Sequence, residues 1–345
     1  MHGGMILDFS VNINPLGMPE QVRKAIAAHI DEYQSYPDPY CRALREAIAR
    51  HENAAAEDIL CGHGSADLIY RLCLSVKPKR MLVLAPTFSE YERAALLAGA
   101  EVLFHRLREE DGFALTERIL EDITPELDML FLCNPNNPTG RLAGPELMER
   151  IADRCRSAGA LLVVDECFLS FTEGISCKSF LQAYPDIVIM DAFTKLYAMA
   201  GVRLGYIITK NHGVLSKAQD SGQFWGVSAV AQTAGLAALE CREYVRETRR
   251  LVAAERAYLA GSLEKLGLCV FPGCANYILF KSEKPLLAAL LKKGLLIRSC
   301  GNYDGLDRRF YRVCVMQRPG NEKLIREITE VLREFPQRGV LSFED

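Results

Sequence analysis

The strongest constraint on the fold is an alternation between short apolar runs and segments with helical spacing of apolar residues. The apolar runs of strand length are 80–86, 101–107, 128–133, 161–166 and 186–193, and residues 144–159 have helical spacing. Such alternation predicts an α/β fold with a mostly parallel sheet and helices on both faces. The near-continuous apolar character of the runs is typical of strands that are buried on both sides.

The pattern changes after Gly226. Residues 228–267 form an almost unbroken series of helix-forming residues, long enough to link two domains. The strand-like segments 269–282, 294–300 and 311–316 follow, and a terminal helix is expected over 321–335. We therefore expect a large domain of residues 34–235 and a smaller α+β domain made of residues 1–33 and 236–345.

Composition narrows the class of protein. The 345 residues are 49% hydrophobic with a net charge of −3, which suits a globular protein with two cores and gives no reason to expect nucleic acid or an anionic membrane as a partner. We expect a cytoplasmic protein, because neither a signal peptide nor a membrane-spanning run is visible. The twelve cysteines include no CxxC pair and the six histidines no HExxH spacing, so we expect buried free thiols and no metal site.

A parallel sheet places the polar ends of its strands along one edge, where ligands of such sheets bind. Five polar segments follow apolar runs and are expected at this edge: 62–67, 86–91, 134–140, 165–168 and 194–203. The third contains NNPTG, which is more elaborate than a plain turn requires.

The first of these segments, residues 62–67, has two interpretations. Gly62 and Gly64 precede a helical pattern that begins at Ser65, and a glycine turn before a helix N-terminus can bind phosphate. The alternative is an ordinary helix cap formed by Ser65. The segment also approaches the GxGxxG dinucleotide fingerprint, but Asp67 occupies the third glycine position.

Two other segments carry charged groups. Asp165 follows a buried strand, where a carboxylate needs a cation or a proton as its partner. The simpler interpretation is that Asp165 caps a helix or lies in a loop. Lys195 lies in an apolar neighbourhood that would lower its pKa and free its amine for imine chemistry, whereas a solvated lysine at a strand end is the alternative. Thr194 and Arg203 could hold a phosphate beside it.

Aromatic and basic residues add weaker signals. Phe88 and Tyr91 could stack on a flat ring or simply pack in the core. Arg298 and Arg312 adjoin strand-like runs, where a guanidinium needs an anion.

NNPTG at 136–140, DECF at 165–168 and Thr194–Lys195 with Arg203 after them together resemble the fold-type-I pyridoxal 5′-phosphate enzymes. The resemblance is to the class I/II aminotransferases that include histidinol-phosphate aminotransferase, and it extends over essentially the whole chain. It implies the aspartate aminotransferase-like fold and pyridoxal 5′-phosphate as the cofactor.

The resemblance assigns roles to individual residues. Lys195 would bind the cofactor covalently, and Asp165 would keep the ring nitrogen protonated so that the ring acts as an electron sink. Asn137 would bond to the phenolic oxygen and Phe88 would stack on the ring. Phe168 stands where many relatives have a tyrosine that donates a second bond to this oxygen.

The resemblance also implies a phosphate site and a homodimer. The cofactor phosphate would be held by the backbone N–H groups of Ser65 and Ala66, and by Thr194 and Arg203. Tyr36 matches a tyrosine that reaches this phosphate from the neighbouring subunit.

Segments near both chain ends, HGG at 2–4, LDFSVNINPLG at 7–17 and residues 296–313, resemble the threonine-phosphate decarboxylases of cobalamin biosynthesis. The resemblance implies a lyase that converts L-threonine O-3-phosphate, or a close O-phospho amino acid, to (R)-1-amino-2-propanol O-2-phosphate and CO₂. His2, Asn14, Arg298 and Arg312 would bind the substrate.

Alternatives remain open from the sequence. One is a histidinol-phosphate-type aminotransferase that uses a 2-oxo acid. A dinucleotide-dependent oxidoreductase built on 62–67 and a cofactor-free binding protein come from other classes.

Overall fold

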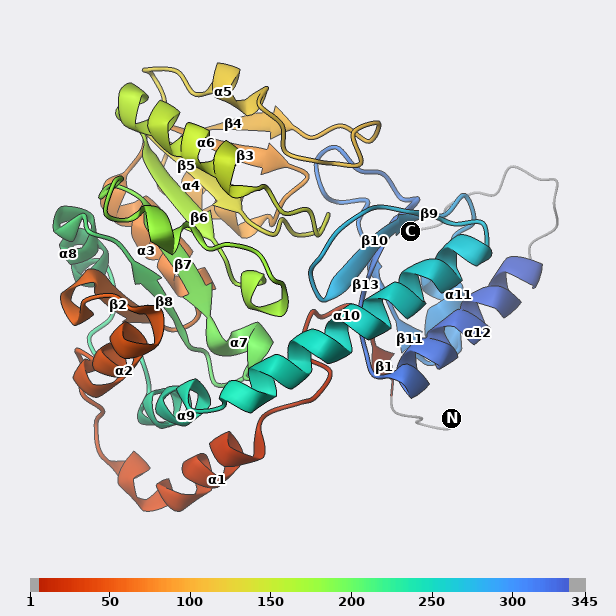
Figure 1. Cartoon of the computed structure of the whole chain (residues 1–345), viewed down its shortest axis with the longest axis horizontal. Coiled ribbons are helices and arrows are strands. Elements are labelled where there is room, and N and C mark those ends of the chain that lie inside the picture. The colour runs from red at the N-terminus through yellow and green to blue at the C-terminus, as the bar shows by residue number, and fades with distance from the viewer. Residues whose placement is uncertain (1–5, 335–345) are drawn as a thin grey trace.

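The computed structural model describes residues 6–334 (Figure 1). Its largest sheet has seven strands in the order β2-β8-β7-β6-β5-β3-β4. Their bounds are β2 Ile59–Gly62, β3 Arg80–Ala85, β4 Glu101–Arg106, β5 Met129–Cys133, β6 Leu161–Asp165, β7 Val188–Ala192 and β8 Gly205–Ile208. The five predicted strands are confirmed within one or two residues at each end.

Strand direction decides where the polar segments lie. The pairs β3–β4, β3–β5, β5–β6 and β6–β7 are parallel, and β8 runs antiparallel to both β7 and β2. The strand β8 was not among the predicted ones, because four residues beginning with glycine give little signal. Since β2 has the same direction as β7, all the strands except β8 end at one edge of the sheet.

Helices cover both faces of this sheet, as Figure 1 shows for α6 in front and for α3 and α4 behind. The helices and turns of this region are α1 Glu20–Ala28, η1 Ile30–Gln34, α2 Arg42–Glu52, η2 Ala56–Asp58, α3 Ser65–Val76, α4 Glu90–Leu97, α5 Ile119–Asp122, α6 Pro145–Ala158, η3 Leu169–Phe171, η4 Cys177–Phe180, α7 Phe193–Leu196 and α8 His212–Asp220. The predicted helix over 144–159 is α6, whose inward face buries Met148, Ile151 and Cys155.

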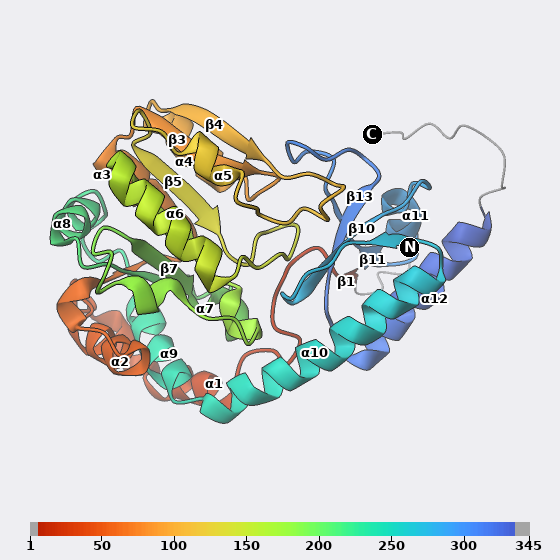
Figure 2. The same ribbon diagram turned by 45° about the horizontal axis from the view of Figure 1, so that its top comes forward.

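The predicted continuous helix after Gly226 is two helices, α9 Ala229–Leu239 and α10 Arg242–Lys265. The chain leaves helical geometry at Cys241, which has ψ 51°, and residues with good helix propensity on both sides conceal this break in the sequence. Figures 1 and 2 show α10 extending from the large sheet to a second one.

The second sheet has the order β12-β13-β10-β9. The elements here are β9 Cys269–Val270, β10 Tyr277–Lys281, α11 Leu287–Lys292, β11 Leu295–Leu296, β12 Arg298–Ser299, β13 Phe310–Cys314 and α12 Arg318–Glu334. Near the N-terminus, β1 Leu7–Asp8 pairs in parallel with β11 in a separate two-stranded sheet, and the Phe9 carbonyl accepts a hydrogen bond from the Cys314 N–H of β13 at 2.9 Å. The predicted terminal helix is α12.

The buried apolar residues form two clusters. One surrounds the large sheet and the other joins Phe9 to α10, α12 and the second sheet. Phe271, Tyr277 and Phe310 of the C-terminal part belong to the first cluster, so the two parts pack against each other. The domain boundaries at residues 34 and 236 stay a prediction. Within residues 6–334, none of the helices combines the length and apolar character needed to cross a bilayer.

Candidate active site

Lys195 lies in the short helix α7, directly after β7. Its side chain is half-buried, and burial lowers the pKa of its ammonium group, helped by the nearby guanidinium groups of Arg312 and Arg203. The carboxylate of Asp165 opposes this effect. Within residues 6–334, the Lys195 ammonium has no hydrogen bond or ion pair, so its amine is available for a covalent bond.

Asp165 is the last residue of β6 and is 5% exposed. Its carboxylate accepts hydrogen bonds from the Tyr91 hydroxyl at 2.7 Å and from the Cys167 backbone N–H at 3.0 Å. Burial nevertheless raises the pKa of Asp165. A carboxylate that is both buried and supplied with donors suits a cationic ring nitrogen as its remaining partner.

The segment after β2 forms a cradle at the start of α3. Gly64 is the N-cap of this helix with φ +84°, and it has no side chain with which to cap the helix. The predicted alternative of Ser65 as the cap is therefore wrong, because Ser65 is the first helical residue. The N–H groups of the first turn have no intrahelical acceptors and point toward solvent or a ligand.

Two glycines allow close approaches at this helix end, and one of these approaches is made by a cation. A Cβ atom on Gly64 would lie 2.7 Å from Nη2 of Arg203, and one on Gly205 would lie 2.8 Å from the Ser65 nitrogen. The Arg203 guanidinium thus lies against the N-terminus of a twelve-residue helix, an arrangement that fits a phosphate group. Thr194, 7% exposed, lies beside Lys195 in α7.

The NNPTG turn is fixed by Asn136. Its Oδ1 accepts a bond from the Thr87 hydroxyl at 2.7 Å, and its Nδ2 donates to the Pro86 carbonyl at 2.9 Å. Its backbone carbonyl accepts a bond from the Tyr277 hydroxyl at 2.8 Å. The neighbouring Asn137 remains for the site, and its Oδ1 accepts a bond from Nη1 of Arg312.

Arg298 and Arg312 are directly opposite each other in the antiparallel pair β12–β13, so both side chains lie on the same face. Arg312 is 6% exposed; its Nη2 donates to the Ser10 carbonyl at 2.6 Å, while its buried Nε has no partner within the described residues. Arg298 donates to Oδ1 of Asn302 at 2.9 Å. Like charges placed opposite each other are unfavourable, and an anion between them would remove the repulsion.

Three further residues were predicted to belong to the site. Asn14 is 3% exposed and uses its side-chain N–H groups on the Leu196 carbonyl at 2.6 Å and the Thr248 hydroxyl at 2.7 Å. It thereby holds the backbone of the Lys195 segment, and its contact with a substrate stays a prediction. Tyr36 is 80% exposed and stacks on Trp225, and His2 lies outside the described residues.

Tyr91 has a role that the sequence did not reveal. Its ring packs in the core, stacked on Phe131 with ring centroids 4.3 Å apart, and its hydroxyl bonds to Asp165. The neighbouring Phe88, expected to stack on the cofactor, meets the Tyr91 ring edge-on. The ring of Tyr91 therefore packs in the core, as the alternative predicted, and the stacking of Phe88 on the cofactor stays a prediction.

A buried network under the site was also missed. Lys178 lies 2.6 Å from a carboxylate oxygen of Glu52 and 3.7 Å from one of Asp191, which belongs to the strand before Lys195. Glu166, next to Asp165, accepts a bond from the Cys177 N–H at 2.7 Å. Burial raises the pKa of Asp191 to about 7. These residues are far apart in the sequence, so no local sequence motif predicts the network.

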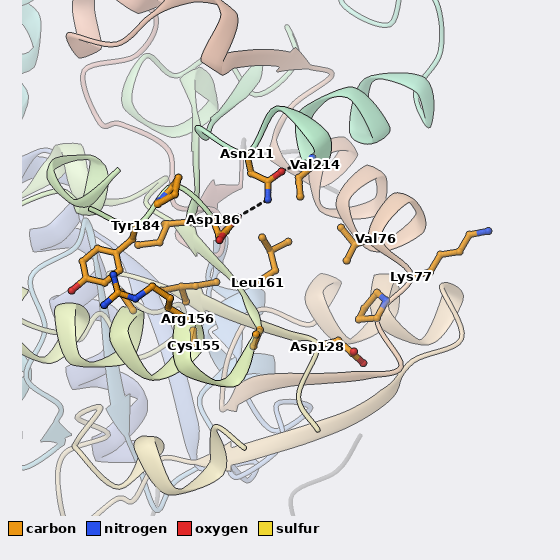
Figure 3. Close-up of a pocket in the computed structure, with 17 residues that line it drawn as sticks. Val76, Lys77, Asp128, Cys155, Arg156, Leu161, Tyr184, Asp186, Asn211 and Val214 are labelled. Carbon is orange, nitrogen blue, oxygen red and sulfur yellow. Dashed lines mark hydrogen bonds between the residues drawn. The ribbon is translucent and has the colours of Figure 1, made fainter. Parts of the chain in front are cut away.

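A cavity of about 370 Å³ lies at the opposite edge of the large sheet (Figure 3). Its walls include Asp128, Leu161 and Ile187 near the starts of strands, and Cys155 and Arg156 near the end of α6. None of the predicted site residues lines it.

The residues at the carboxyl edge fit pyridoxal phosphate. Three features lie there: the half-buried Lys195, the buried carboxylate of Asp165, and the helix N-terminus beside Arg203. The charge interactions of Lys195 with Asp165 and Arg203 indicate that these groups are close together. The geometry therefore agrees with the predicted cofactor.

Comparison with known proteins gives consistent results. The chain is 40% identical over 332 residues to a threonine-phosphate decarboxylase of Salmonella typhimurium, covering 95% of this chain and 91% of the relative. It is 34% identical to a histidinol-phosphate aminotransferase of Symbiobacterium thermophilum, covering 95% and 91%. A solved histidinol-phosphate aminotransferase from Clostridium acetobutylicum superposes with a TM-score of 0.90 at 29% identity, covering 96% of this chain and all of the other.

A further solved structure, an L-threonine-O-3-phosphate decarboxylase from Porphyromonas gingivalis, has a TM-score of 0.85 at 24% identity, covers 95% of this chain and 100% of that one, and supports the fold alone. The family model described as aminotransferase class I and II matches residues 5–328. These matches confirm the predicted fold and pyridoxal 5′-phosphate as the cofactor. The chain belongs to the class I and II aminotransferase family.

Proposed function

We propose that the chain is a pyridoxal-phosphate-dependent lyase that decarboxylates L-threonine O-3-phosphate, or a close O-phospho amino acid, in cobamide synthesis. The observation that carries the proposal is the opposed pair Arg298 and Arg312, with a buried unpaired Nε on the latter. A substrate with both a carboxylate and a phosphate offers two anions for two guanidinium groups. The 40% identity to a threonine-phosphate decarboxylase over most of both chains supports the same reaction.

Bound pyridoxal phosphate supplies an electron-accepting ring that stabilises negative charge at Cα of an amino acid. In the proposed site, Lys195, whose ammonium pKa is lowered by burial, would bind the cofactor, and Asp165 would hold a proton at the ring nitrogen. Asn137 would bind the phenolic oxygen and Phe88 would cover the ring.

The cofactor phosphate would be held by the Ser65 and Ala66 N–H groups, Thr194 and Arg203. Arg298 and Arg312 would decide which bond at Cα breaks, because they fix where the substrate carboxylate lies.

A histidinol-phosphate-type aminotransferase is the second candidate. The 34% identity to such an enzyme and the 0.90 TM-score to another favour it. This reaction needs a 2-oxo acid and proceeds in two separable halves. The dinucleotide-dependent oxidoreductase has no comparable support, since the chain belongs to the class I and II aminotransferase family.

The deciding experiment supplies purified holoenzyme with L-threonine O-phosphate and no 2-oxo acid. Release of CO₂ over many turnovers, with aminopropanol phosphate identified by mass spectrometry, is the expected result. Absence of CO₂ together with glutamate-driven conversion of the cofactor to its amine form would establish the aminotransferase instead.

Variants connect this assay to the arginine pair. Arg298→Lys and Arg312→Lys should each raise KM for the phosphorylated substrate about tenfold or more, because a lysine cannot bind an anion through two parallel bonds. Arg309→Lys is the matched control, since Arg309 is already paired with Asp307 and Glu283. Equal effects of all three substitutions would contradict the proposed anion site.

We also propose a homodimer in which Tyr36 reaches the cofactor phosphate of the partner. Tyr36 stacks on Trp225 at 4.6 Å between ring centroids, and Tyr40 meets Phe224 edge-on. These four rings, called here the aromatic patch, are all at least 39% exposed, and exposed aromatic clusters of this kind are typical of interfaces.

The dimer can be tested by sedimentation and by subunit mixing. Tyr36→Phe and Lys195→Ala subunits should each have low activity, and a mixed dimer should regain activity because one of its sites combines an intact Lys195 with the partner's intact Tyr36. A monomer in sedimentation, or no recovery of activity on mixing the subunits, would contradict the proposal.

We place the enzyme in the cytoplasm, because its cysteines are free thiols that suit a reducing compartment.

A further inference from the structure

A buried arginine lies close to the phosphate cradle and is not among the predicted site residues. Arg71 belongs to α3, the helix that begins at the cradle, and is 6% exposed. Its Nε donates to Oδ1 of Asp67 at 3.0 Å, and its Nη2 lies 2.9 Å from Oδ2 of the same carboxylate. The two residues are four positions apart on one helix face and form an ion pair through two parallel bonds.

The Asp67 carboxylate connects this ion pair to the cradle. Its Oδ2 accepts a hydrogen bond from the His63 N–H at 2.9 Å. A Cβ atom on Gly62 would lie 2.9 Å from the same oxygen, so the chain that leaves β2 passes close to the carboxylate. Asp67 is the third residue of α3, a position from which a side chain can hold the residues before a helix. It therefore fixes the path of residues 62–64, which lead into the N–H groups of the first turn.

The same carboxylate is a source of repulsion for a phosphate. An anion in the cradle would share the helix N-terminus with the negative charge of Asp67. Like charges at close range oppose binding unless a cation neutralises one of them. Arg71 supplies this cation, whereas Arg203 lies against Gly64 and remains for the ligand. The two arginines therefore have different tasks: Arg203 would contact the phosphate, and Arg71 would act through Asp67.

Two glycines enclose Arg71 from the side opposite Asp67. A Cβ atom on Gly222 would lie 2.1 Å from Cζ of Arg71, and one on Gly226 would lie 2.8 Å from its Nη2. Neither glycine has a positive φ, so space and not backbone geometry excludes a side chain at these positions. A methyl group at position 222 would push the guanidinium away from its place beside the carboxylate.

We propose that Arg71 is a positioning residue for the cofactor phosphate. It holds the Asp67 carboxylate against the His63 N–H and neutralises its charge, so that the helix N-terminus can accept a phosphate dianion. The segment 222–226 keeps Arg71 in this position. The inference rests on the assigned cofactor and is independent of the proposed substrate.

The test separates the phosphate of the cofactor from the rest of it. The full-length protein, freed of cofactor, is titrated with pyridoxal phosphate and in parallel with pyridoxal, which has the same ring and aldehyde but lacks the phosphate. The ratio of the two dissociation constants measures what the cradle contributes to binding. Inorganic phosphate, added as a competitor of pyridoxal phosphate, reports on the cradle without the ring.

Substitution of Arg71 should act on the phosphate alone. Arg71→Met removes the cation and keeps an unbranched side chain in its place. It should raise the dissociation constant for pyridoxal phosphate about tenfold or more and leave that for pyridoxal within about twofold of the wild type. Arg71→Lys should lie between the wild type and Arg71→Met, because a lysine keeps the charge but cannot form the two parallel bonds.

Gly222→Ala tests the same geometry without removing a polar group. The added methyl group should displace Arg71 from Asp67 and weaken the binding of pyridoxal phosphate selectively, as Arg71→Met does. Gly261→Ala in α10 is the matched control, because the described residues leave the space around a Cβ atom at Gly261 open, apart from its chain neighbours and its own helix backbone. This control should leave both dissociation constants unchanged.

A double substitution tests whether Asp67 is the link. In the background of Asp67→Asn, the charge that Arg71 neutralises is gone. Arg71→Met should then weaken the binding of pyridoxal phosphate less than it does in the wild type. Equal effects in the two backgrounds would overturn the action through Asp67.

Two results would overturn the proposal as a whole. One is an unchanged affinity for pyridoxal phosphate in both Arg71→Met and Gly222→Ala. The other is an equal loss of affinity for pyridoxal phosphate and pyridoxal, because a loosened fold affects both ligands and a distorted cradle affects only one. If Arg71→Met does not fold, Arg71→Lys and Gly222→Ala still give this comparison. Since no substrate is used, failure of decarboxylation would leave the binding measurements intact, and the two proposals fail separately.

Discussion

The hydrogen bond between Tyr91 and Asp165 allows a sharp prediction for the variant Tyr91→Phe. The substitution removes one hydroxyl group and leaves the ring, which is stacked on Phe131 and 1% exposed. Among residues 6–334, the Asp165 carboxylate then keeps the Cys167 N–H as its donor. The variant should fold normally, because the apolar contacts of the ring are unchanged.

The magnitude follows from the charge of the acceptor. A hydrogen bond to a charged group contributes about 1.5–3 kcal/mol, which corresponds to about 10- to 150-fold in a binding constant. Since the ionised Asp165 is the partner of the cofactor's ring nitrogen, the variant should bind pyridoxal phosphate more weakly by a factor in this range.

The effect should depend on pH with a defined sign. Burial already raises the pKa of Asp165, and loss of the Tyr91 donor raises it further. The carboxyl group is then protonated at pH values where it is still ionised in the wild type. The loss of affinity should therefore be largest at low pH and should diminish as the pH rises.

The assay is a titration of apoenzyme with pyridoxal phosphate across pH, compared with the control Tyr311→Phe. Tyr311 of β13 is 2% exposed and belongs to the second apolar cluster, and its hydroxyl accepts a bond from the Leu286 N–H at the N-cap of α11. The control should alter stability and leave cofactor affinity unchanged. Equal affinity of wild type and Tyr91→Phe at every pH would refute the reasoning.

The remaining predictions concern the buried network of Lys178, Glu52 and Asp191, and Phe168, which stands where many relatives have a tyrosine. Lys178→Met leaves the carboxylates of Glu52 and Asp191 without their cation and should lower the free energy of unfolding by about 3–5 kcal/mol. Adding Glu52→Gln should restore part of this loss. An unchanged denaturation midpoint of Lys178→Met would contradict the prediction. Because the pKa of Asp191 in the folded chain is raised to about 7, its contribution to stability is present at low pH and is lost as the pH rises through 7. Asp191→Asn should remove this component from the pH dependence of unfolding, and a superimposable profile would count against it. Phe168→Tyr should add a donor at the phenolic oxygen and move the pH midpoint of the bound cofactor's absorbance downward, so identical titrations would argue against that contact.

Much of the fold could be predicted because local patterns determine it. Apolar runs bounded by turn residues identify strands, and helical spacing between them requires crossover connections and hence parallel pairing. Parallel pairing in turn places the ends of the strands at one edge. Asp165 is the last residue of a strand, and Asn137 and Lys195 each follow one, so their convergence could be inferred without knowing a single contact.

Other features required the tertiary structure, because they depend on side-chain direction and on pairing between distant segments. The bond from Arg312 to Asn137 joins residues 175 positions apart, and only the β12–β13 register sets Arg298 beside Arg312. The break between α9 and α10 is invisible where both sides favour helix. The sequence alone determined which chemical groups lie at the edge of the sheet. The packing of α2 and the second sheet against that edge decided which of these groups touch. The reason is that no local spacing encodes a contact between separate elements.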